Sequence, residues 1–192
     1  MGVLALQGDV AEHRSMLALC GADPVDVKRP EQLDEIDGLV IPGGESTTIG
    51  KLLYRFGLLE PLNRRVREGF PVYGTCAGMI LLARQVQDAG VDQPIIGAMD
   101  ISVRRNAFGR QRESFETDLD VPALGSEPLH AVFIRAPVIE EAGDKVDILA
   151  SLPDGRSVVA RQGSMLVSSF HPELTGDTRM HRYFLDMVKD GA

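Results

Sequence analysis

The sequence predicts an α/β fold with three layers, in which helices cover both faces of a mostly parallel central sheet. Short apolar runs alternate with helical patterns through the first half of the chain, an order that is typical of a parallel sheet covered on both faces. The second half carries several β-rich segments and a hairpin turn signal, which predict an antiparallel extension of the sheet.

The first half supplies the parallel strands and their crossover helices. Asp9 is the expected N-cap of a helix that runs to about Leu19. A long helical stretch after the third strand is expected to break near Gly57 and Pro61. The expected strands are Val3–Leu6, Val25–Val27, Gly38–Ile41 and Pro71–Tyr73.

The second half supplies the antiparallel part. The turn Pro153-Asp154-Gly155 predicts a hairpin, and an amphipathic helix from about Thr178 to Lys189 closes the chain. No linker separates domains, so residues 1–192 are expected to form one domain. The expected strands are Ile96–Val103, Phe115–Val121, Ala131–Ile134, Val146–Ser151, Ser157–Gln162 and Met165–Phe170.

Composition excludes several classes of partner. The net charge is -8, from 20 Lys and Arg against 28 Asp and Glu, which argues against nucleic acid or an anionic membrane. We see no targeting segment and no apolar run near the ~20 residues of a membrane helix, so we expect a cytoplasmic protein. Of the two cysteines, Cys20 is expected in the core of the first helix, and Cys76 is expected as a free thiol.

Cys76 carries the strongest chemical signal. It lies in Gly74-Thr75-Cys76-Ala77-Gly78, between an expected strand and an apolar helical run. This is the Gly-x-nucleophile-x-Gly pattern of a nucleophile elbow, whose glycines leave room where chain segments approach closely. The N–H groups of the following helix would favour a thiolate and could hold an oxyanion. The pattern predicts acyl transfer through a thioester.

A thiol nucleophile needs a base and a group that orients the base. His171 follows the strand Met165–Phe170, at the sheet edge where Cys76 also lies, and Glu173 would lie on the same side as His171. His13 and His181 fall in helical patterns and are expected at the surface or half-buried. No second Cys or His has ligand spacing from Cys76, so we expect neither metal nor cofactor.

The loop Pro42–Ser46 has two interpretations. It is either a flexible loop in which Ser46 caps the next helix, or a site whose N–H groups hold an anion while Glu45 binds an ammonium group. Its position after a strand would bring it close to Cys76 in one pocket.

Together these motifs resemble the class I glutamine amidotransferases, and within them the family of glutaminase subunits of pyridoxal 5'-phosphate synthase. The similarity spans essentially the whole chain, and the implied fold is flavodoxin-like, as in other class I glutamine amidotransferases. The motifs that carry it are Leu6-Gln7-Gly8, Pro42 to Thr48, Gly74 to Gly78, Arg105 to Gln111, Phe133 to Pro137 and Ser169 to Thr175.

The resemblance implies a glutaminase that releases ammonia from L-glutamine for a separate synthase subunit in a large hetero-oligomer. It implies that Cys76 is the nucleophile, that His171 held by Glu173 is the acid and base, and that Gly44 and Ala77 form the oxyanion hole. The substrate-binding positions that it implies are Gly44, Glu45, Ser46, Arg105, Ile134 and Arg135. A surface ion pair is the competing interpretation for Arg105 and Arg135.

Three other functions fit parts of the pattern. A glutaminase that feeds another synthase would share the triad but differ in the segments Arg105–Gln111 and Phe133–Pro137. A thiol peptidase or stress-response protein would share the cysteine elbow alone. A non-catalytic interaction module would leave the set Cys76, His171 and Glu173 without a purpose.

Overall fold

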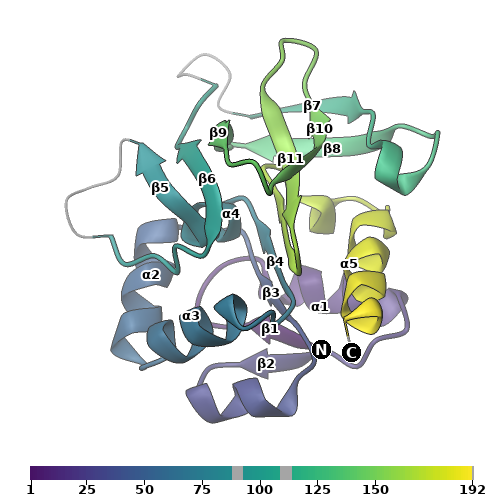
Figure 1. Cartoon of the computed structure of the whole chain (residues 1–192). Helices are drawn as coiled ribbons and strands as arrows, with labels where there is room; N and C mark the ends of the chain where they lie inside the picture. Colours follow the sequence, from purple (N-terminus) through teal and green to yellow (C-terminus); the bar gives the residue numbers. More distant parts are fainter. Residues whose placement is uncertain (88–92, 109–113, 192) are drawn as a thin grey trace.

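The structure, a computed structural model, describes residues 1–87, 93–108 and 114–191 (Figure 1). Within these residues the central sheet has the strand order β2-β1-β3-β4-β12-β11-β9-β6-β5, and β10 pairs with β11. Its strands are β1 (Gly2–Leu4), β2 (Val25–Val27), β3 (Leu39–Ile41), β4 (Val72–Thr75), β5 (Ala83–Gln87), β6 (Met99–Arg104), β9 (Val138–Ala142), β10 (Asp147–Ser151), β11 (Ser157–Gln162) and β12 (Met165–Ser168).

The predicted division of the sheet is confirmed. Strands β2, β1, β3, β4 and β12 are mutually parallel, and β11 then pairs antiparallel with both β12 and β9. The sequence did not predict β5 or β9. Two segments expected in this sheet form a separate antiparallel ribbon instead, made of β7 (Ser114–Leu119) and β8 (Leu129–Ile134).

Helices lie on both faces of the parallel part of the sheet (Figure 1). Alternate strand residues face opposite sides, so Val40 and Tyr73 pack in the core that contains α5, while Ile41 and Val72 pack in the core that contains α2 and α3. The helices are α1 (Val10–Leu19), α2 (Ser46–Arg55), α3 (Leu59–Arg67), α4 (Ala77–Leu82) and α5 (Arg179–Asp190), with short 3-10 helices η1 (Pro30–Glu35), η2 (Pro122–Leu124) and η3 (Pro172–Leu174).

The predicted break of the helical stretch near Gly57 is confirmed, whereas the prediction of a break near Pro61 is wrong. Gly57 has φ +68° and separates α2 from α3. Pro61 is the third residue of α3, where a backbone N–H has no partner within the helix, so proline is tolerated there. Helix starts and strand starts are otherwise within a few residues of their predicted positions.

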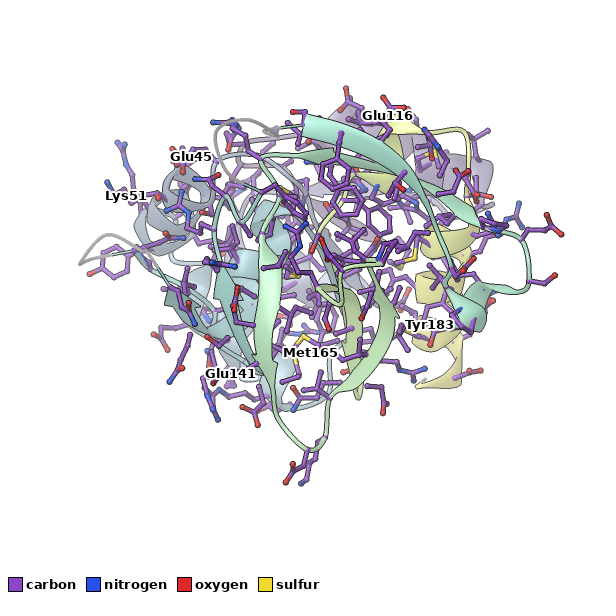
Figure 2. All side chains as sticks on the ribbon, turned by 90° about the horizontal axis from the view of Figure 1, so that it is seen from above. Glu45, Lys51, Glu116, Glu141, Met165 and Tyr183 are labelled. Carbon is purple, nitrogen blue, oxygen red and sulfur yellow. The ribbon has the colours of Figure 1, made fainter. Side chains whose placement is uncertain are left out.

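Side chains divide between core and rim as expected for a folded α/β protein. Met165 is 8% exposed, whereas the charged side chains of Lys51, Glu116 and Glu141 project at the edge of the molecule (Figure 2). None of the helices in the described ranges is long and apolar enough to cross a membrane.

Candidate active site

Cys76 lies on the predicted elbow between β4 and α4. Its backbone has φ +46° and ψ -99°, a conformation that a non-glycine residue adopts only under constraint, and its N–H donates to the carbonyl of Ser168 at 2.8 Å. A Cβ on Gly74 would lie 2.6 Å from the carbonyl carbon of Gly78, and a Cβ on Gly78 would overlap the carbonyl oxygen of Ile41. The predicted steric need for both glycines is confirmed.

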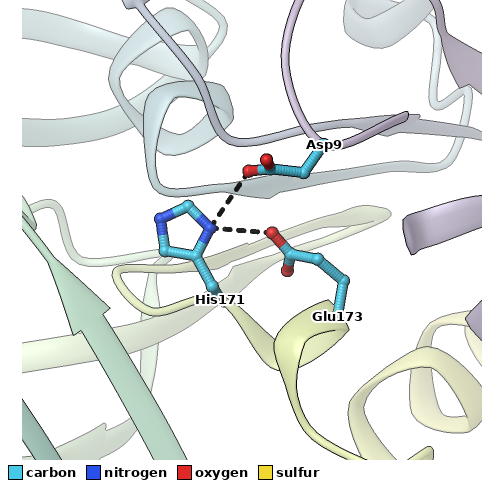
Figure 3. Close-up of side chains that lie close together, drawn as sticks. All are labelled: Asp9, His171 and Glu173. Atoms are coloured by element: carbon cyan, nitrogen blue, oxygen red, sulfur yellow. Dashed lines mark hydrogen bonds and ion pairs between the residues drawn. The ribbon is translucent and has the colours of Figure 1, made fainter. Parts of the chain in front are cut away.

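His171 lies beyond the end of β12, on the same edge of the sheet as the elbow. Its N–H donates to the carbonyl of Val132 in β8 at 2.9 Å, which ties the histidine to the ribbon. Its Nδ1 lies 2.7 Å from Oε1 of Glu173, the second residue of η3, as Figure 3 shows. The prediction that Glu173 lies on the same side as His171 is therefore confirmed.

Asp9 is a third member of this group, and the sequence did not predict it. Its carboxylate makes no cap bond to α1, so the predicted capping role is wrong. Instead, Oδ2 of Asp9 lies 3.3 Å from Nδ1 of His171, the same ring nitrogen that Glu173 contacts (Figure 3). A contact between residues so far apart in the sequence leaves no local pattern. The sequence therefore predicted only that Asp9, which comes just before a helix, would cap it.

The three charged groups shift one another's protonation. Burial lowers the pKa of His171, but hydrogen bonds to Asp9, Cys76 and Glu173 outweigh it, so the pKa of His171 is raised. Burial raises the pKa of Glu173 despite its bond to His171, and the bond from His171 lowers the pKa of Asp9. The site therefore favours an imidazolium between two carboxyl groups.

The geometry leaves one ring nitrogen of His171 for chemistry. Nδ1 is engaged by the carboxylates, so the proton on Nδ1 is assigned from those contacts and Nε2 is the nitrogen that can exchange a proton. Cys76 is a free thiol that is 7% exposed, and its Sγ lies 4.0 Å from the carbonyl oxygen of Ile134. Cys76 and His171 are thus at the same edge, as expected.

Glu45 and Arg105 come together beside the elbow. Glu45 is the N-cap of α2, since its carboxylate accepts from the N–H groups of Thr47 and Thr48, so the interpretation of Ser46 as the cap is wrong. Nη2 of Arg105 lies 3.3 Å from Oε1 of Glu45. The side chain of Ser46 is buried, and its hydroxyl has no partner among the described residues.

The Gly43–Gly44 peptide has a defined orientation. The carbonyl of Gly43 accepts from the N–H of Asp9 at 3.3 Å, and in a trans peptide the N–H of Gly44 points the opposite way. Gln7 supports the loop by accepting from the N–H of Glu45 at 2.8 Å. Ala77 is the first residue of α4, so its N–H has no partner within the helix. The oxyanion hole formed by Gly44 and Ala77 remains a prediction.

Ile134 ends β8 next to the elbow, and Arg135 follows it. Phe133, one residue before Ile134, packs edge-on against Phe170 with ring centroids 5.6 Å apart, which holds the end of β8 against the segment after β12 that leads to His171. Arg135 is exposed and has φ +44°. The remaining residues of the expected Arg105–Gln111 motif, from 109 onward, lie outside the described residues.

Asp9, His171 and Glu173 could in principle hold a metal ion, since one ligand atom from each lies within 4.8 Å of the others. A shared proton on Nδ1 of His171 accounts for the same geometry, because both carboxylates face that nitrogen. The expectation of no metal stays a prediction.

Sequence reasoning placed two further histidines wrongly. His13 and His181 were expected at the surface or half-buried, but both are fully buried. Cys20 was expected in the core and is instead half-buried at the C-cap of α1. Apolar periodicity alone assigned these histidines to the polar faces of their helices.

A mixed sheet with a cysteine elbow and a histidine–carboxylate pair at one edge is the architecture of glutamine amidotransferases. A crystal structure of a glutamine amidotransferase matches the chain with a TM-score of 0.92 and 49% identity, covering 98% of both chains. A putative GMP synthase subunit from Thermoplasma acidophilum shares the fold, with a TM-score of 0.69 at 18% identity over 98% of this chain and 93% of that one.

The chain belongs to the SNO glutamine amidotransferase family, whose model matches residues 3–190. Among its relatives is the pyridoxal 5'-phosphate synthase subunit PdxT of Frankia alni, which is 61% identical over all of this chain and 96% of the relative. The PdxT of Pelotomaculum thermopropionicum is 63% identical over 97% of this chain and 93% of its own length.

Proposed function

We propose that residues 1–192 act as one glutaminase domain, which hydrolyses L-glutamine to L-glutamate and ammonia and delivers the ammonia to the synthase subunit that makes pyridoxal 5'-phosphate. The observation that carries the proposal is the meeting of Cys76 with the pair His171 and Glu173 at one sheet edge. Relatives about 60% identical over nearly their full length bear the name of this synthase's PdxT subunit, which supports the choice of partner.

The chemistry uses one nucleophile and one acid-base group. The thiolate of Cys76 attacks the side-chain amide carbon of glutamine, and N–H groups of Gly44 and Ala77 stabilise the oxyanion. His171, protonated in this environment, gives its Nε2 proton to the departing nitrogen, so ammonia leaves and a thioester remains. His171 then takes a proton from water as the hydroxide attacks the thioester, which releases glutamate and restores the thiolate.

The substrate's amino-acid end fits the charges beside the elbow. An α-carboxylate prefers a guanidinium or N–H donors, and an α-ammonium group prefers a carboxylate. Arg105 and Glu45 offer these two groups within 3.3 Å of each other. Ser46, Ile134 and Arg135 complete the proposed pocket, with the carbonyl of Ile134 4.0 Å from Sγ of Cys76.

Two free cysteines fit a reducing compartment, and we propose that the protein works in the cytoplasm. No cofactor is required by the steps above, because each step moves only protons and acyl groups between named residues and water.

Glutamate release from glutamine tests the proposal. The rate is measured for the wild-type chain with and without the synthase subunit, and for Cys76→Ala and Cys20→Ala. We expect activity that rises with the partner, vanishes in Cys76→Ala and persists in Cys20→Ala, because Cys20 lies at the end of α1. Equal activity in the wild-type and Cys76→Ala proteins would sink the mechanism.

A further inference from the structure

A pair of buried histidines lies behind the site, and the proposed chemistry does not use it. His13 in α1 and His181 in α5 are both fully buried. Nδ1 of His13 lies 2.9 Å from Nε2 of His181, so one of these nitrogens donates to the other. Burial removes an imidazole from water at a cost in free energy, which hydrogen bonds to its ring nitrogens offset.

The opposite edge of His13 faces the two halves of the candidate site. Its Nε2 lies 3.0 Å from Oγ1 of Thr75, the residue before Cys76, and 3.4 Å from Oε2 of Glu173. That oxygen makes no hydrogen bond within the described part of the chain, while the other oxygen of Glu173 holds His171. His13 is therefore placed to donate to the carboxylate that orients the base.

Two independent arguments select the tautomer of His13. A lone pair on Nε2 would face the carboxylate oxygen of Glu173 and repel it, whereas an N–H there is attracted. Nδ1 of His181 has no partner among the described residues, and a bare nitrogen without a partner costs less than a buried N–H without one. Both arguments put the proton on Nε2 of His13 and on Nε2 of His181.

The charge state agrees with this assignment. Burial, followed by the charges of His181 and His171, lowers the pKa of His13 well below its ordinary value. Burial lowers the pKa of His181 to about 4. Both rings are therefore neutral near pH 7, with one donor and one acceptor nitrogen each.

We propose that His13 is a positioning residue of this site: its Nε2–H holds Oε2 of Glu173 and Oγ1 of Thr75, while His181 fixes its tautomer. The proposal rests on the glutaminase function proposed above. With both oxygens held, Glu173 keeps the ring of His171 aimed at the elbow and stabilises the imidazolium that forms in the reaction.

Two amide variants at position 13 separate this role from general packing. In glutamine the amide nitrogen takes the place of Nε2, so His13→Gln keeps the donor toward Glu173. In asparagine the amide takes the place of Nδ1, so His13→Asn keeps only the contact with His181. Both are neutral, and their thermal unfolding is measured to match their stability. His130→Gln, an exposed histidine of β8, is the control.

The expected difference lies in kcat and in its pH dependence. In the complex with the synthase subunit, kcat of His13→Asn should fall about 10- to 100-fold with an unchanged KM, whereas His13→Gln should lose less than about threefold. The acid limb of the kcat profile should move to higher pH in His13→Asn, because Glu173 loses a donor. The ionisable groups facing His13 are His181 from α5 and Glu173 from η3, with His171 beyond Glu173, Tyr73 from β4 against the ring of His181, and Asp9 on the turn before α1.

Ring ¹⁵N NMR of the wild-type chain tests the tautomers without any substrate. We expect protonated Nε2 and bare Nδ1 in both His13 and His181. A protonated Nδ1 in His13, an equal loss of kcat in both amide variants, or no loss in His13→Asn would each overturn the proposal. If the wild-type protein releases no glutamate, the glutaminase function fails, and the NMR assignment still decides the contact with Glu173.

Discussion

The guanidinium of Arg105 lies 3.3 Å from the carboxylate of Glu45, although 60 residues separate them in the chain. Glu45 is fixed by two N–H groups at the start of α2, and Arg105 follows β6 and also reaches Thr47 and Gln93. Burial works against the ionised form of Glu45, but the bonds from Thr48 and Thr47 and the charge of Arg105 lower its pKa overall. An amino acid such as glutamine carries both charges, so its α-carboxylate could pair with Arg105 and its α-ammonium group with Glu45 in place of the ion pair between the two side chains.

Replacing Arg105 by alanine should raise KM for glutamine more than it lowers kcat. The carboxylate of the substrate loses a charge-assisted contact, which is worth about 1.5–3 kcal/mol or about a 10- to 100-fold loss in kcat/KM. Steady-state glutamate release measures both constants. Arg104→Ala is the matched control, because Arg104 pairs with Glu140 on β9 at 2.7 Å. An unchanged KM in Arg105→Ala would remove Arg105 from the pocket.

Gly78→Ala should destabilise the fold or prevent it. A Cβ at this position would overlap the carbonyl of Ile41, and backbone on both sides cannot move far inside a packed core. We expect a loss of about 1–3 kcal/mol or more in the free energy of unfolding, measured by urea denaturation. Gly176→Ala should change it little, since no atom of the described residues lies within 4 Å of a Cβ there and its φ is ordinary. Equal stability of the two variants would contradict the steric account of the elbow.

Local features of the site could be predicted from the sequence, and contacts between distant segments could not. The elbow around Cys76 and the contact between His171 and Glu173, two residues apart, each depend on residues that are close in the sequence. The structure has both features. Asp9 was misread because the same residue type caps helices and binds histidine. The burial of His13 was missed because its polar partners come from α5, η3 and β4.

In the fold, too, local patterns could be predicted from the sequence, and the pairing of distant segments could not. Alternating apolar runs predicted the parallel strands, which lie side by side in the order β2-β1-β3-β4-β12. The exposed pattern of β5, with only Ala83 fully buried, gave no apolar signal for a strand. The ribbon of β7 and β8 could not be separated from the sheet, because period-two alternation is the same in both.

Glu173→Gln should lower kcat far more than Asp9→Asn. Glu173 is buried and lies 2.7 Å from Nδ1 of His171, whereas Asp9 is partly exposed and lies 3.3 Å away. Loss of the buried anion should cost about 10- to 100-fold in kcat, and loss of the exposed one less than about tenfold. Glu12→Gln, on the exposed face of α1, is the control for charge alone. A larger effect at Asp9 would make it, and not Glu173, the group that orients His171.

Acid should weaken the fold through His13 and His181. Both have a native pKa below the ordinary value of 6.5, and that of His181 falls to about 4. Between pH 6.5 and about pH 4, these two histidines bind more protons in the unfolded chain than in the native one. Stability from these groups is therefore fully present above about pH 6.5 and is lost as the pH falls. Each such group contributes at most about 1.4 kcal/mol per pH unit to the slope.

His171 and His130 act in the opposite sense, because their native pKa values are raised and their contribution is lost as the pH rises above 6.5. The comparison must therefore be made between variants. Urea denaturation of His181→Gln and of the wild-type chain across this range should give a flatter fall of the unfolding free energy in the variant, since glutamine takes up no proton. Above pH 6.5, where His130 contributes, His130→Gln should remove a fall of the unfolding free energy with rising pH, and below pH 6.5 it should leave the slope unchanged. Parallel curves for wild type and His181→Gln would mean that His181 takes up its proton equally well in the native and unfolded chains. Its full burial, and the lack of a partner for its Nδ1 among the described residues, argue against this.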